Sequence, residues 1–282
     1  MDESQTFYKN CSIRESTVAT LNKGTANPFY NIFLFQGSGE VRIDFADYRF
    51  DGNIALFSTP YQHIHFRAEP QLSVCALQFH GDFYCIEYHK KEVACNGLLF
   101  NNIYLQPFIQ VSSGQFQELQ ELFSKLASEL NFTDTYSEAV ARAYLQLVLA
   151  LSSKIKIGSM VSGDEEQTRH PVMQFKALLE QYFYTKRQPS FYAEQLGISA
   201  NAFSKKCKEH YQRSPSELIH ERVILEAKKL IHLTYRSIKQ IAAELNFDDE
   251  NYFSRYFKKH TGVTPTTFRE NVGISIAADL SS

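Results

Sequence analysis

A short stretch near the carboxyl end combines amide, hydroxyl and cationic side chains at helical spacing. Residues 245–269 read LNFDDENYFSRYFKKHTGVTPTTFR. Leu245, Phe253 and Phe257 fall on one side of this stretch, which is therefore expected to be buried. The opposite side carries Asn251, Ser254, Arg255, Lys258 and Lys259. Amide, hydroxyl and guanidinium groups can read base edges, and ammonium groups bind phosphates, so this face has the chemistry of a nucleic-acid contact.

Local signals delimit this basic helix on both sides. Asp248 is predicted to cap its amino end, and Gly262 is predicted to stop it. Thr264 and Pro265 then offer an N-cap and a first-turn proline to a following helix. The sequence therefore predicts a short helix held between two turns.

The same arrangement occurs a second time, earlier in the chain. Phe203 corresponds to Phe253 and Pro215 to Pro265, both at an offset of 50 residues. Ser199 is placed to cap the earlier helix. Two copies of one helix-turn-helix unit explain this internal repeat.

The helix between the two copies is predicted to set their separation. Capping boxes at Ser214-x-x-Glu217 and Ser237-x-x-Gln240 mark helix starts on either side of it. Residues 216–232 would span roughly 25 Å as a helix. With its turns, such a spacer can hold the two units about one DNA turn, roughly 34 Å, apart on the same face.

The repeat also carries a dense motif at fixed spacing. Its members are Phe247, Tyr252-Phe253-Ser254-Arg255, Phe257-Lys258-Lys259, Gly262, Thr264-Pro265 and Phe268-Arg269. This motif resembles the signature of the AraC/XylS family of bacterial transcription regulators, and the resemblance covers about the last hundred residues. Asn246 stands where the family usually has glycine. Because Asn tolerates the left-handed conformation, we expect it to replace glycine in the turn.

The resemblance implies a regulator that binds double-stranded DNA sequence-specifically, with no enzymatic activity and no cofactor. By position in the motif, it implies base-edge contacts from Asn201, Ser204, Lys205, Glu250, Asn251 and Arg255. Contacts with DNA phosphates are expected from Lys208, Tyr252, Lys258 and Lys259. RNA polymerase is a further candidate partner of such a protein.

The amino-terminal half shows short apolar and aromatic runs separated by turn signals. The predicted strands are Tyr30–Phe35, Val41–Phe45, Ile54–Ser58, His63–Phe66, Leu72–Phe79 and Leu98–Tyr104. Regular short strands predict a sandwich or barrel. Beside the carboxy-terminal motif, this pattern resembles the cupin-like sensor domain of AraC-type regulators.

Two amphipathic helices are predicted after the strands. Phe116, Leu119, Phe123, Leu126 and Leu130 form the first apolar stripe, and Val140, Tyr144, Leu147, Val148 and Leu151 form the second. The two helices either cover the core of the barrel or form the interface of a homodimer, and the sequence favours neither.

The predicted fold is a mainly-β cupin-like barrel plus two helices, followed by an all-α double helix-turn-helix domain. The expected divisions are a sensor and dimerisation domain at 1–156, with strands over about 29–110 and helices over about 113–156, a linker at 157–171, a DNA-binding domain at 172–272 and a tail at 273–282. Residues 171–272 hold 16 of the 29 Lys and Arg residues and 11 of the 31 Asp and Glu residues, a formal charge of +5 against −7 for the remainder. A basic part joined to an acidic part is expected if only one of them meets phosphate.

The strand domain offers candidate residues for a small-molecule effector. Phe33, Phe35, Phe57, Tyr61, His63 and His65 could line a pocket, although strand aromatics are more often ordinary core. His63 and His65 form an H-x-H pair of the kind that binds metals, but the full metal motif of cupin enzymes is absent, so no metal is predicted. Two alternatives stay open: a metal-dependent cupin enzyme fused to a nucleic-acid-binding module, and a regulator whose first domain only dimerises.

Composition places the chain among ordinary globular proteins. The 282 residues suffice for two domains with separate cores. The acidic start MDESQ leads into no apolar run, so we expect a cytoplasmic protein without membrane association. Five cysteines without a C-x-x-C pair fit reduced thiols.

Overall fold

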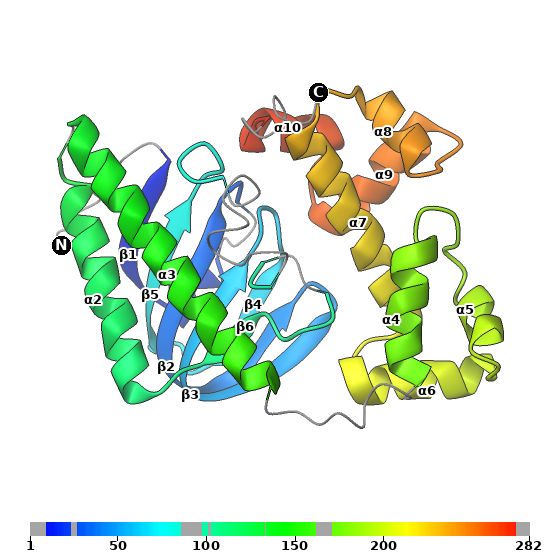
Figure 1. The fold of residues 1–282 in the computed structure, drawn as a ribbon, viewed down its shortest axis with the longest axis horizontal. Coiled ribbons are helices and arrows are strands. Elements are labelled where there is room, and N and C mark those ends of the chain that lie inside the picture. The colour runs from blue at the N-terminus through cyan, green and yellow to red at the C-terminus, as the bar shows by residue number, and fades with distance from the viewer. Residues whose placement is uncertain are drawn as a thin grey trace.

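A strand-rich amino-terminal part is followed by a helical carboxy-terminal part (Figure 1). The computed structural model describes residues 10–23, 27–85, 98–100, 103–132, 134–161 and 171–274. The strands are β1 (Cys11–Thr17), β2 (Tyr30–Ile43), β3 (Ala46–Ser58), β4 (Ile64–Ala68), β5 (Ser73–Phe79) and β6 (Phe108–Gln110). The first three helices are α1 (Val18–Leu21), α2 (Ser113–Glu129) and α3 (Thr135–Val161). The carboxy-terminal helices are α4 (Pro171–Tyr182), α5 (Pro189–Gln195), α6 (Ala200–Tyr211), α7 (Pro215–Leu233), α8 (Ile238–Glu244), α9 (Glu250–Thr261) and α10 (Pro265–Val272).

The strands form one antiparallel sheet in the order β1-β5-β2-β3-β6, with β4 paired to β2 off this path. Alternate residues of β2 enter different cores: Ile32 and Leu34 pack on the side of α2 and α3, whereas Phe33 and Phe35 pack on the opposite side. Because both faces of the first part of this strand, residues 30–35, are buried, its sequence there is mostly apolar. The predicted mainly-β class is confirmed. Among the described strands, β1 and β6 end the path without pairing with each other, so the sheet is open.

Three strand predictions differ from the structure. The predicted strand Tyr30–Phe35 and residues 41–43 of the predicted strand Val41–Phe45 are parts of one long strand, β2. Residues 98–100 form a bend and Ile103 and Tyr104 lie in a turn, so the described part of the predicted strand 98–104 is not a strand, and the sixth strand is β6. Strand β1 is absent from the prediction because its sequence, CSIREST, is mostly polar. It is an edge strand that pairs with β5 on one side only, and polar residues are tolerated at a sheet edge.

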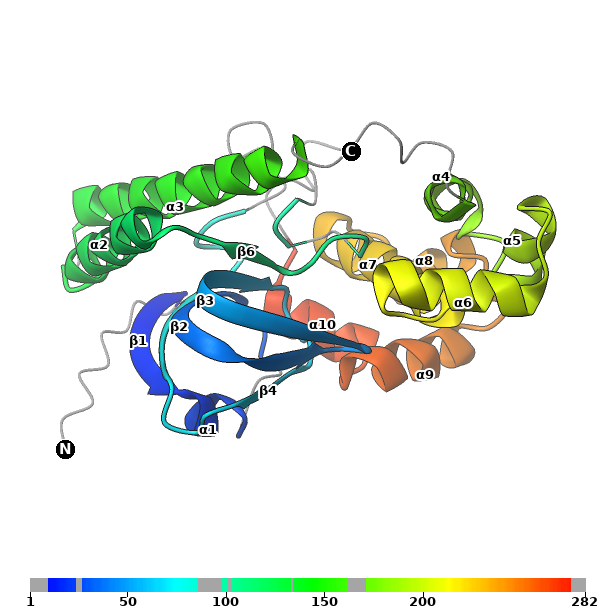
Figure 2. The ribbon, with the colours of Figure 1, turned by 90° about the horizontal axis from the view of Figure 1, so that it is seen from below.

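Helices α2 and α3 form a layer over one face of the sheet (Figure 2). The predicted stripe of α2 is confirmed, because Phe116, Leu119, Phe123, Leu126 and Leu130 are all buried. The predicted stripe of α3 is partly wrong. Ala141, Leu145 and Val148 face the core, and Val140 and Leu147 remain 40% and 44% exposed. The predicted residues cover more of the helix circumference than the sheet can bury. The buried side of α3 is centred on Ala141, Leu145 and Val148, so Val140 and Leu147 lie outside it.

Helix α3 continues beyond the predicted end at 156. It runs to Val161, so the first residues of the predicted linker 157–171 are helical, and α4 already begins at Pro171. Lys156 anchors this last part of α3, since its ammonium group is buried and donates to the carbonyl oxygens of Gln106 and, at 3.1 Å, Phe108. The loss of hydration lowers the pKa of Lys156 to about 8.

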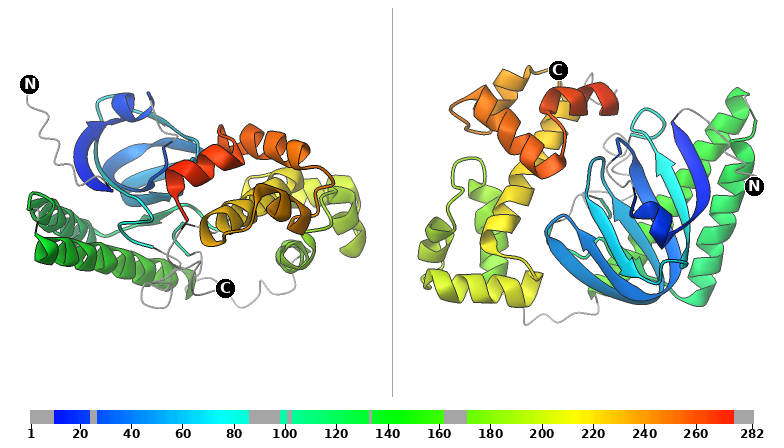
Figure 3. Two further views of the ribbon diagram at one scale, coloured as in Figure 1. Left: turned by 90° about the horizontal axis from the view of Figure 1, so that it is seen from above. Right: turned by 180° about the vertical axis from the view of Figure 1, so that it is seen from behind.

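The helical part has its own apolar core and lies beside the sheet (Figure 3). Its largest fully buried side chains are Phe175, Tyr192, Phe203, Phe253, Phe257 and Phe268. The predicted caps are confirmed at Ser199, at both capping boxes and at Thr264. Local capping and a buried aromatic cluster thus fix the positions of these short helices. Residues 275–282 of the predicted tail lie outside the described part of the chain.

Within the described ranges, no helix combines the length and the apolar character needed to cross a membrane.

Two glycines with open space at the position of a Cβ atom predict opposite effects of the same substitution. Gly197 has a φ of +64° between α5 and α6, whereas Gly158 lies within α3, and a Cβ at either position would meet no atom within 4 Å. Gly197→Ala should therefore lower the free energy of unfolding by about 1 kcal/mol through backbone strain. Gly158→Ala should raise it by about 0.5 kcal/mol, because alanine favours the helix. Urea unfolding followed by circular dichroism measures both, and shifts of equal sign would contradict this account.

Candidate nucleic-acid interface

The turns of the two repeated units have the same backbone geometry. Gly197 joins α5 to α6 with a φ of 64°, and Asn246 joins α8 to α9 with a φ of 56°. The residue after each turn donates its amide to an alanine carbonyl: Ile198 to Ala193 at 3.1 Å, and Phe247 to Ala242 at 2.9 Å. Asn246 therefore takes the left-handed conformation expected of the glycine that it replaces. The internal repeat of the sequence is a repeat of structure.

Both second helices of these units end in the same way. Gln212 after α6 and Gly262 after α9 are left-handed, with φ of 57° and 81°. Their amides donate to the carbonyl oxygens of Lys208 at 3.0 Å and Lys258 at 2.9 Å. Gly262 thus stops α9 as predicted, and a non-glycine residue performs the same task after α6.

Asp249, and not the predicted Asp248, caps the amino end of α9. Its carboxylate accepts the amides of Asn251 at 3.2 Å and Tyr252 at 2.9 Å. These backbone hydrogen bonds lower the pKa of Asp249. The helix starts one residue later than the sequence indicated, because Asp249 has the extended backbone of an N-cap.

The polar face of α6 lies opposite a buried side made of Phe203, Cys207 and Tyr211. The predicted base-reading residues Asn201 and Lys205 are exposed, Ser204 is half-buried, and the predicted phosphate contact Lys208 is exposed. Lys205 also lies 3.8 Å from Glu209, one helical turn further along. This exposed pair contributes little to stability, so its ammonium group remains available to a ligand.

The corresponding face of α9 is more cationic. Phe253 and Phe257 are buried, whereas the predicted DNA contacts Glu250, Asn251, Tyr252, Arg255, Lys258 and Lys259 are all exposed. The Asn251 amide donates to Asp249 at 3.3 Å, which orients the side chain at the start of the helix. The structure thus brings the predicted residues of each copy together on one outward face.

The two recognition helices, α6 and α9, both point their carboxyl ends at the sheet domain (Figure 2). Tyr211 at the end of α6 packs on Tyr104, with ring centroids 5.9 Å apart. His260 at the end of α9 packs on Phe45 at 5.6 Å, and Gly262 lies against the His63 ring. Because both helices end at the same domain, they run in the same general direction.

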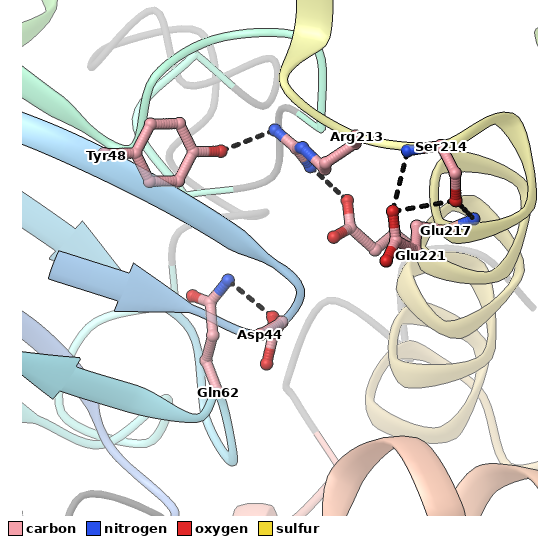
Figure 4. A network of polar contacts seen from close by, with 7 residues as sticks. All are labelled: Asp44, Tyr48, Gln62, Arg213, Ser214, Glu217 and Glu221. Atoms are coloured by element: carbon pink, nitrogen blue, oxygen red, sulfur yellow. Dashed lines mark hydrogen bonds and ion pairs between the residues drawn. The ribbon is translucent and has the colours of Figure 1, made fainter. Parts of the chain in front are cut away.

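A buried polar network joins α7 to the sheet domain (Figure 4). Arg213, just before α7, forms an ion pair with Glu221 and donates to the Tyr48 hydroxyl at 2.6 Å. Burial raises the pKa of Glu221 to about 7, although the Arg213 guanidinium opposes this shift. On the sheet side, Gln62 donates to Asp44 at 3.0 Å. No sequence motif indicated these contacts, because Tyr48 and Arg213 lie in different domains.

More contacts extend this domain junction toward α10. Lys228 donates to the Pro60 carbonyl at 2.8 Å, and burial lowers its pKa to about 8. Asn271 donates to the Tyr61 hydroxyl at 2.6 Å, and the His80 ring contacts the Asn271 carbonyl at 2.9 Å. Hydrogen bonds from α7 and α10 therefore reach the loops at one end of the sheet.

A cavity of about 80 Å³ lies at this domain junction. Its walls combine apolar side chains such as Phe57 and Phe100 with the polar groups of Asp44, Arg213 and Lys228. This composition suits a small ligand that has both apolar and polar groups.

The six predicted effector residues do not gather around one cavity. Phe57 lines the junction cavity, whereas Phe33 and Phe35 pack with Phe66 in the core on the opposite face of the sheet. Tyr61 packs on Phe268 of the helical core, at 5.5 Å between ring centroids. His63 and His65 are exposed. In the described part of the chain, no group of three or more His, Cys, Asp and Glu residues is arranged to hold a metal ion.

Comparison with known proteins agrees with this geometry. Residues 192–271 match a family model described as a helix-turn-helix domain. The activator RhaS of Enterobacter sp. (strain 638) is 22% identical over 168 residues, which is 59% of this chain and 59% of RhaS. The activator RhaR of Cronobacter sakazakii is 25% identical over 204 residues, 71% of each chain. The chain thus spans about three fifths of the length of the first of these relatives.

Among solved structures, a substituted form of apo ToxT from Vibrio cholerae is 17% identical and covers 94% of this chain and 98% of its own, with a TM-score of 0.41. The carboxy-terminal part of the chain is a helix-turn-helix domain. The predicted resemblance of this part to AraC/XylS regulators is confirmed by the matched domain and by the similarity to RhaS and RhaR.

The environment of His260 predicts a pH dependence of stability. Burial lowers the pKa of His260 to about 4, and His220 and Lys259 add to this effect. The folded-state value lies below the ordinary value of about 6.5, so the stabilisation is fully present above pH 6.5 and is lost as the pH falls toward 4. Because the ring is only partly buried, we expect a loss of about 1 kcal/mol.

His260→Phe should flatten the free energy of unfolding between pH 6.5 and 4, since phenylalanine keeps the ring contacts but does not titrate. Urea unfolding at several pH values measures the difference from the wild type. Identical pH profiles for both proteins would contradict the assignment to His260.

Proposed function

We propose that the protein is a sequence-specific DNA-binding transcription regulator, divided into a sensor and dimerisation domain at 1–156, a linker region and a DNA-binding domain at 172–272. One observation carries this proposal: the two units present matching polar faces on helices that run in the same direction. The names of RhaS and RhaR as transcriptional activators support it. Duplex DNA offers successive major-groove segments to two such helices.

Side-chain chemistry suggests how the two helices divide their contacts. Asn201 and Asn251 can each bind adenine with two hydrogen bonds, Arg255 and Lys205 can bind guanine, and Glu250 can accept from the cytosine amino group. Ser204 completes the base-reading set on α6. The remaining contacts set register on the backbone: Lys208, Tyr252, Lys258 and Lys259 reach phosphate and sugar. RNA polymerase is the further partner that a transcription regulator requires.

An effector fits the junction between the domains better than the interior of the sheet. The core around Phe33 and Phe35 is filled by aromatic contacts, whereas the junction contains a cavity with polar walls. A ligand there would touch the sheet, α7 and His260 of α9 at once. It regulates DNA binding only if its affinity differs between two arrangements of the domains.

The outward side of α3 supports a homodimer. Tyr136, Val140, Leu147 and Ile157 are 84%, 40%, 44% and 44% exposed. They belong to a series at 136, 140, 143, 147, 150, 154 and 157, whose alternating steps of four and three are typical of a two-helix coiled-coil seam. The side facing the core holds α3 on the sheet, and dimerisation through the outward side would let one helix serve both roles that the sequence left open.

Leu147→Glu tests the homodimer. A carboxylate in the middle of an apolar seam should convert a dimer into a monomer while leaving the fold intact, because Leu147 does not contact the core. Sedimentation equilibrium measures the mass, and Lys125→Glu on the exposed side of α2 is the control. A Leu147→Glu variant that keeps the wild-type mass would exclude this interface.

DNA recognition is tested by selecting bound duplexes from a random pool, with and without a metabolite extract. On the enriched sequence, Arg255→Ala should cost about 1 to 3 kcal/mol of binding free energy and relax the preference at one base pair. Lys258→Ala should weaken binding to all sequences alike and reduce the slope against salt concentration by about one.

Titration of each variant against operator and mismatched duplexes separates base reading by Arg255 from phosphate binding by Lys258. Lys125→Ala, far from α6 and α9, is the control for the loss of a cation. Equal losses on every duplex would remove Arg255 from the base-reading set. A pool without any enriched sequence would count against the proposed function itself. Operator affinity that no metabolite changes would count against an effector.

A further inference from the structure

A side chain of the first helix-turn-helix unit reaches directly into the second. Arg187 lies in the connection between α4 and α5. Its guanidinium donates to the carbonyl oxygen of Leu245 and, at 3.3 Å, to that of Asn246. These carbonyls belong to the end of α8 and to the left-handed turn that leads into α9. The contact thus spans the two units without involving the spacer helix α7.

The chemistry of this contact favours arginine in particular. The last carbonyls of a helix have no partner within the helix, and they carry the negative end of its dipole. The Arg187 guanidinium binds there and also lies over the Phe247 ring, 3.7 Å from its centroid. A planar cation can satisfy two carbonyls and stack on a ring at once, which lysine cannot do.

The turn itself does not need Arg187 in order to form. Backbone hydrogen bonds already close it, from Leu245 to Ile241, from Asn246 to Ala243 and from Phe247 to Ala242, each at 2.9 Å. The first unit forms the equivalent bonds at Gly197 and Ile198. What Arg187 adds is therefore a constraint on where the second turn lies relative to the first unit.

We propose that Arg187 is a positioning residue that fixes the phase between α6 and α9, and hence the spacing between the two DNA half-sites that the protein accepts. This inference rests on the proposed function, since it requires both helices to bind DNA. The clamped turn is followed at once by Asp249 and the first residues of α9, which carry Glu250 and Asn251. A displacement of the turn moves these side chains along the groove, where neighbouring base pairs are about 3.4 Å apart.

Spacing dependence distinguishes this role from general stabilisation. A residue that only supports the fold changes affinity for all duplexes, whereas a residue that fixes the phase changes how strongly affinity depends on the spacer. The probes are the selected bipartite duplex and versions of it with one base pair inserted into or deleted from the centre. A duplex with a single half-site reports the binding of one unit alone.

The variants are Arg187→Leu, which removes both contacts, and Arg187→Lys, which keeps the charge. Lys186→Ala is the matched control, because the neighbouring Lys186 lies over Phe191 within its own unit. The wild type and Lys186→Ala should lose about tenfold or more in affinity for each change of one base pair. Arg187→Leu should lose about threefold or less, and Arg187→Lys should resemble it, with single-site binding unchanged in all four proteins.

The outcomes separate this inference from the function on which it rests. Wild-type spacing dependence in a folded Arg187→Lys or Arg187→Leu variant overturns the role of Arg187 and leaves DNA binding intact. A wild type that binds no duplex, or tolerates every spacing equally, overturns the two-site function and the inference with it. If Arg187→Leu does not fold, Arg187→Lys decides alone.

Discussion

The phase between two short helices is the constraint on which the rest of the structure depends. Each recognition helix can read only a few base pairs, so specificity requires that α6 and α9 meet successive turns of the groove together. Helix α7 provides most of this separation, and a capping box fixes its first residue. Its buried residues lie on both sides, because it packs against both units. The spacer is therefore held along its length and not only at its ends.

The domain junction adds a second support to the same pair of helices. Contacts from Tyr104, Phe45 and His63 reach the ends of α6 and α9. Between them, the buried network of Tyr48, Arg213 and Glu221 ties the start of α7 to strand β3. Loss of one partner of such a pair costs more than the pair contributes, since it leaves an uncompensated buried charge. Breaking the Arg213–Glu221 pair is therefore expected to destabilise the junction.

A ligand in the junction cavity would lie close to a helix that is proposed to bind DNA. The walls of the cavity include Phe45 and His260, the pair in contact at the end of α9. They also include Glu221 of α7. A ligand bound there could therefore affect α9 through direct contact. In the proposed homodimer, the exposed side of α3 that would form the interface faces away from the sheet (Figure 3).

Local features of the fold could be predicted from the sequence, and contacts between distant residues could not. Caps, left-handed turns and the repeat around Phe203 and Phe253 are encoded within a few residues, so even the conformation of Asn246 is predicted correctly. The apolar stripe of α2 and most strands follow from periodicity. Strand β1 is missed because an edge strand can be polar. The cap of α9 is assigned to Asp248 instead of Asp249 because the sequence offers two adjacent carboxylates and does not distinguish them. No local signal pairs Tyr48 with Arg213, or Arg187 with Leu245. The base-reading and phosphate-binding assignments remain predictions.

Hydroxyl-radical footprinting on the selected duplex tests the central claim most directly. If α6 and α9 read successive major-groove segments, each bound subunit protects two patches whose centres lie about 10 base pairs apart on one face of the DNA. A single protected patch, or two patches on opposite faces, would contradict the claim that both helices read DNA in phase.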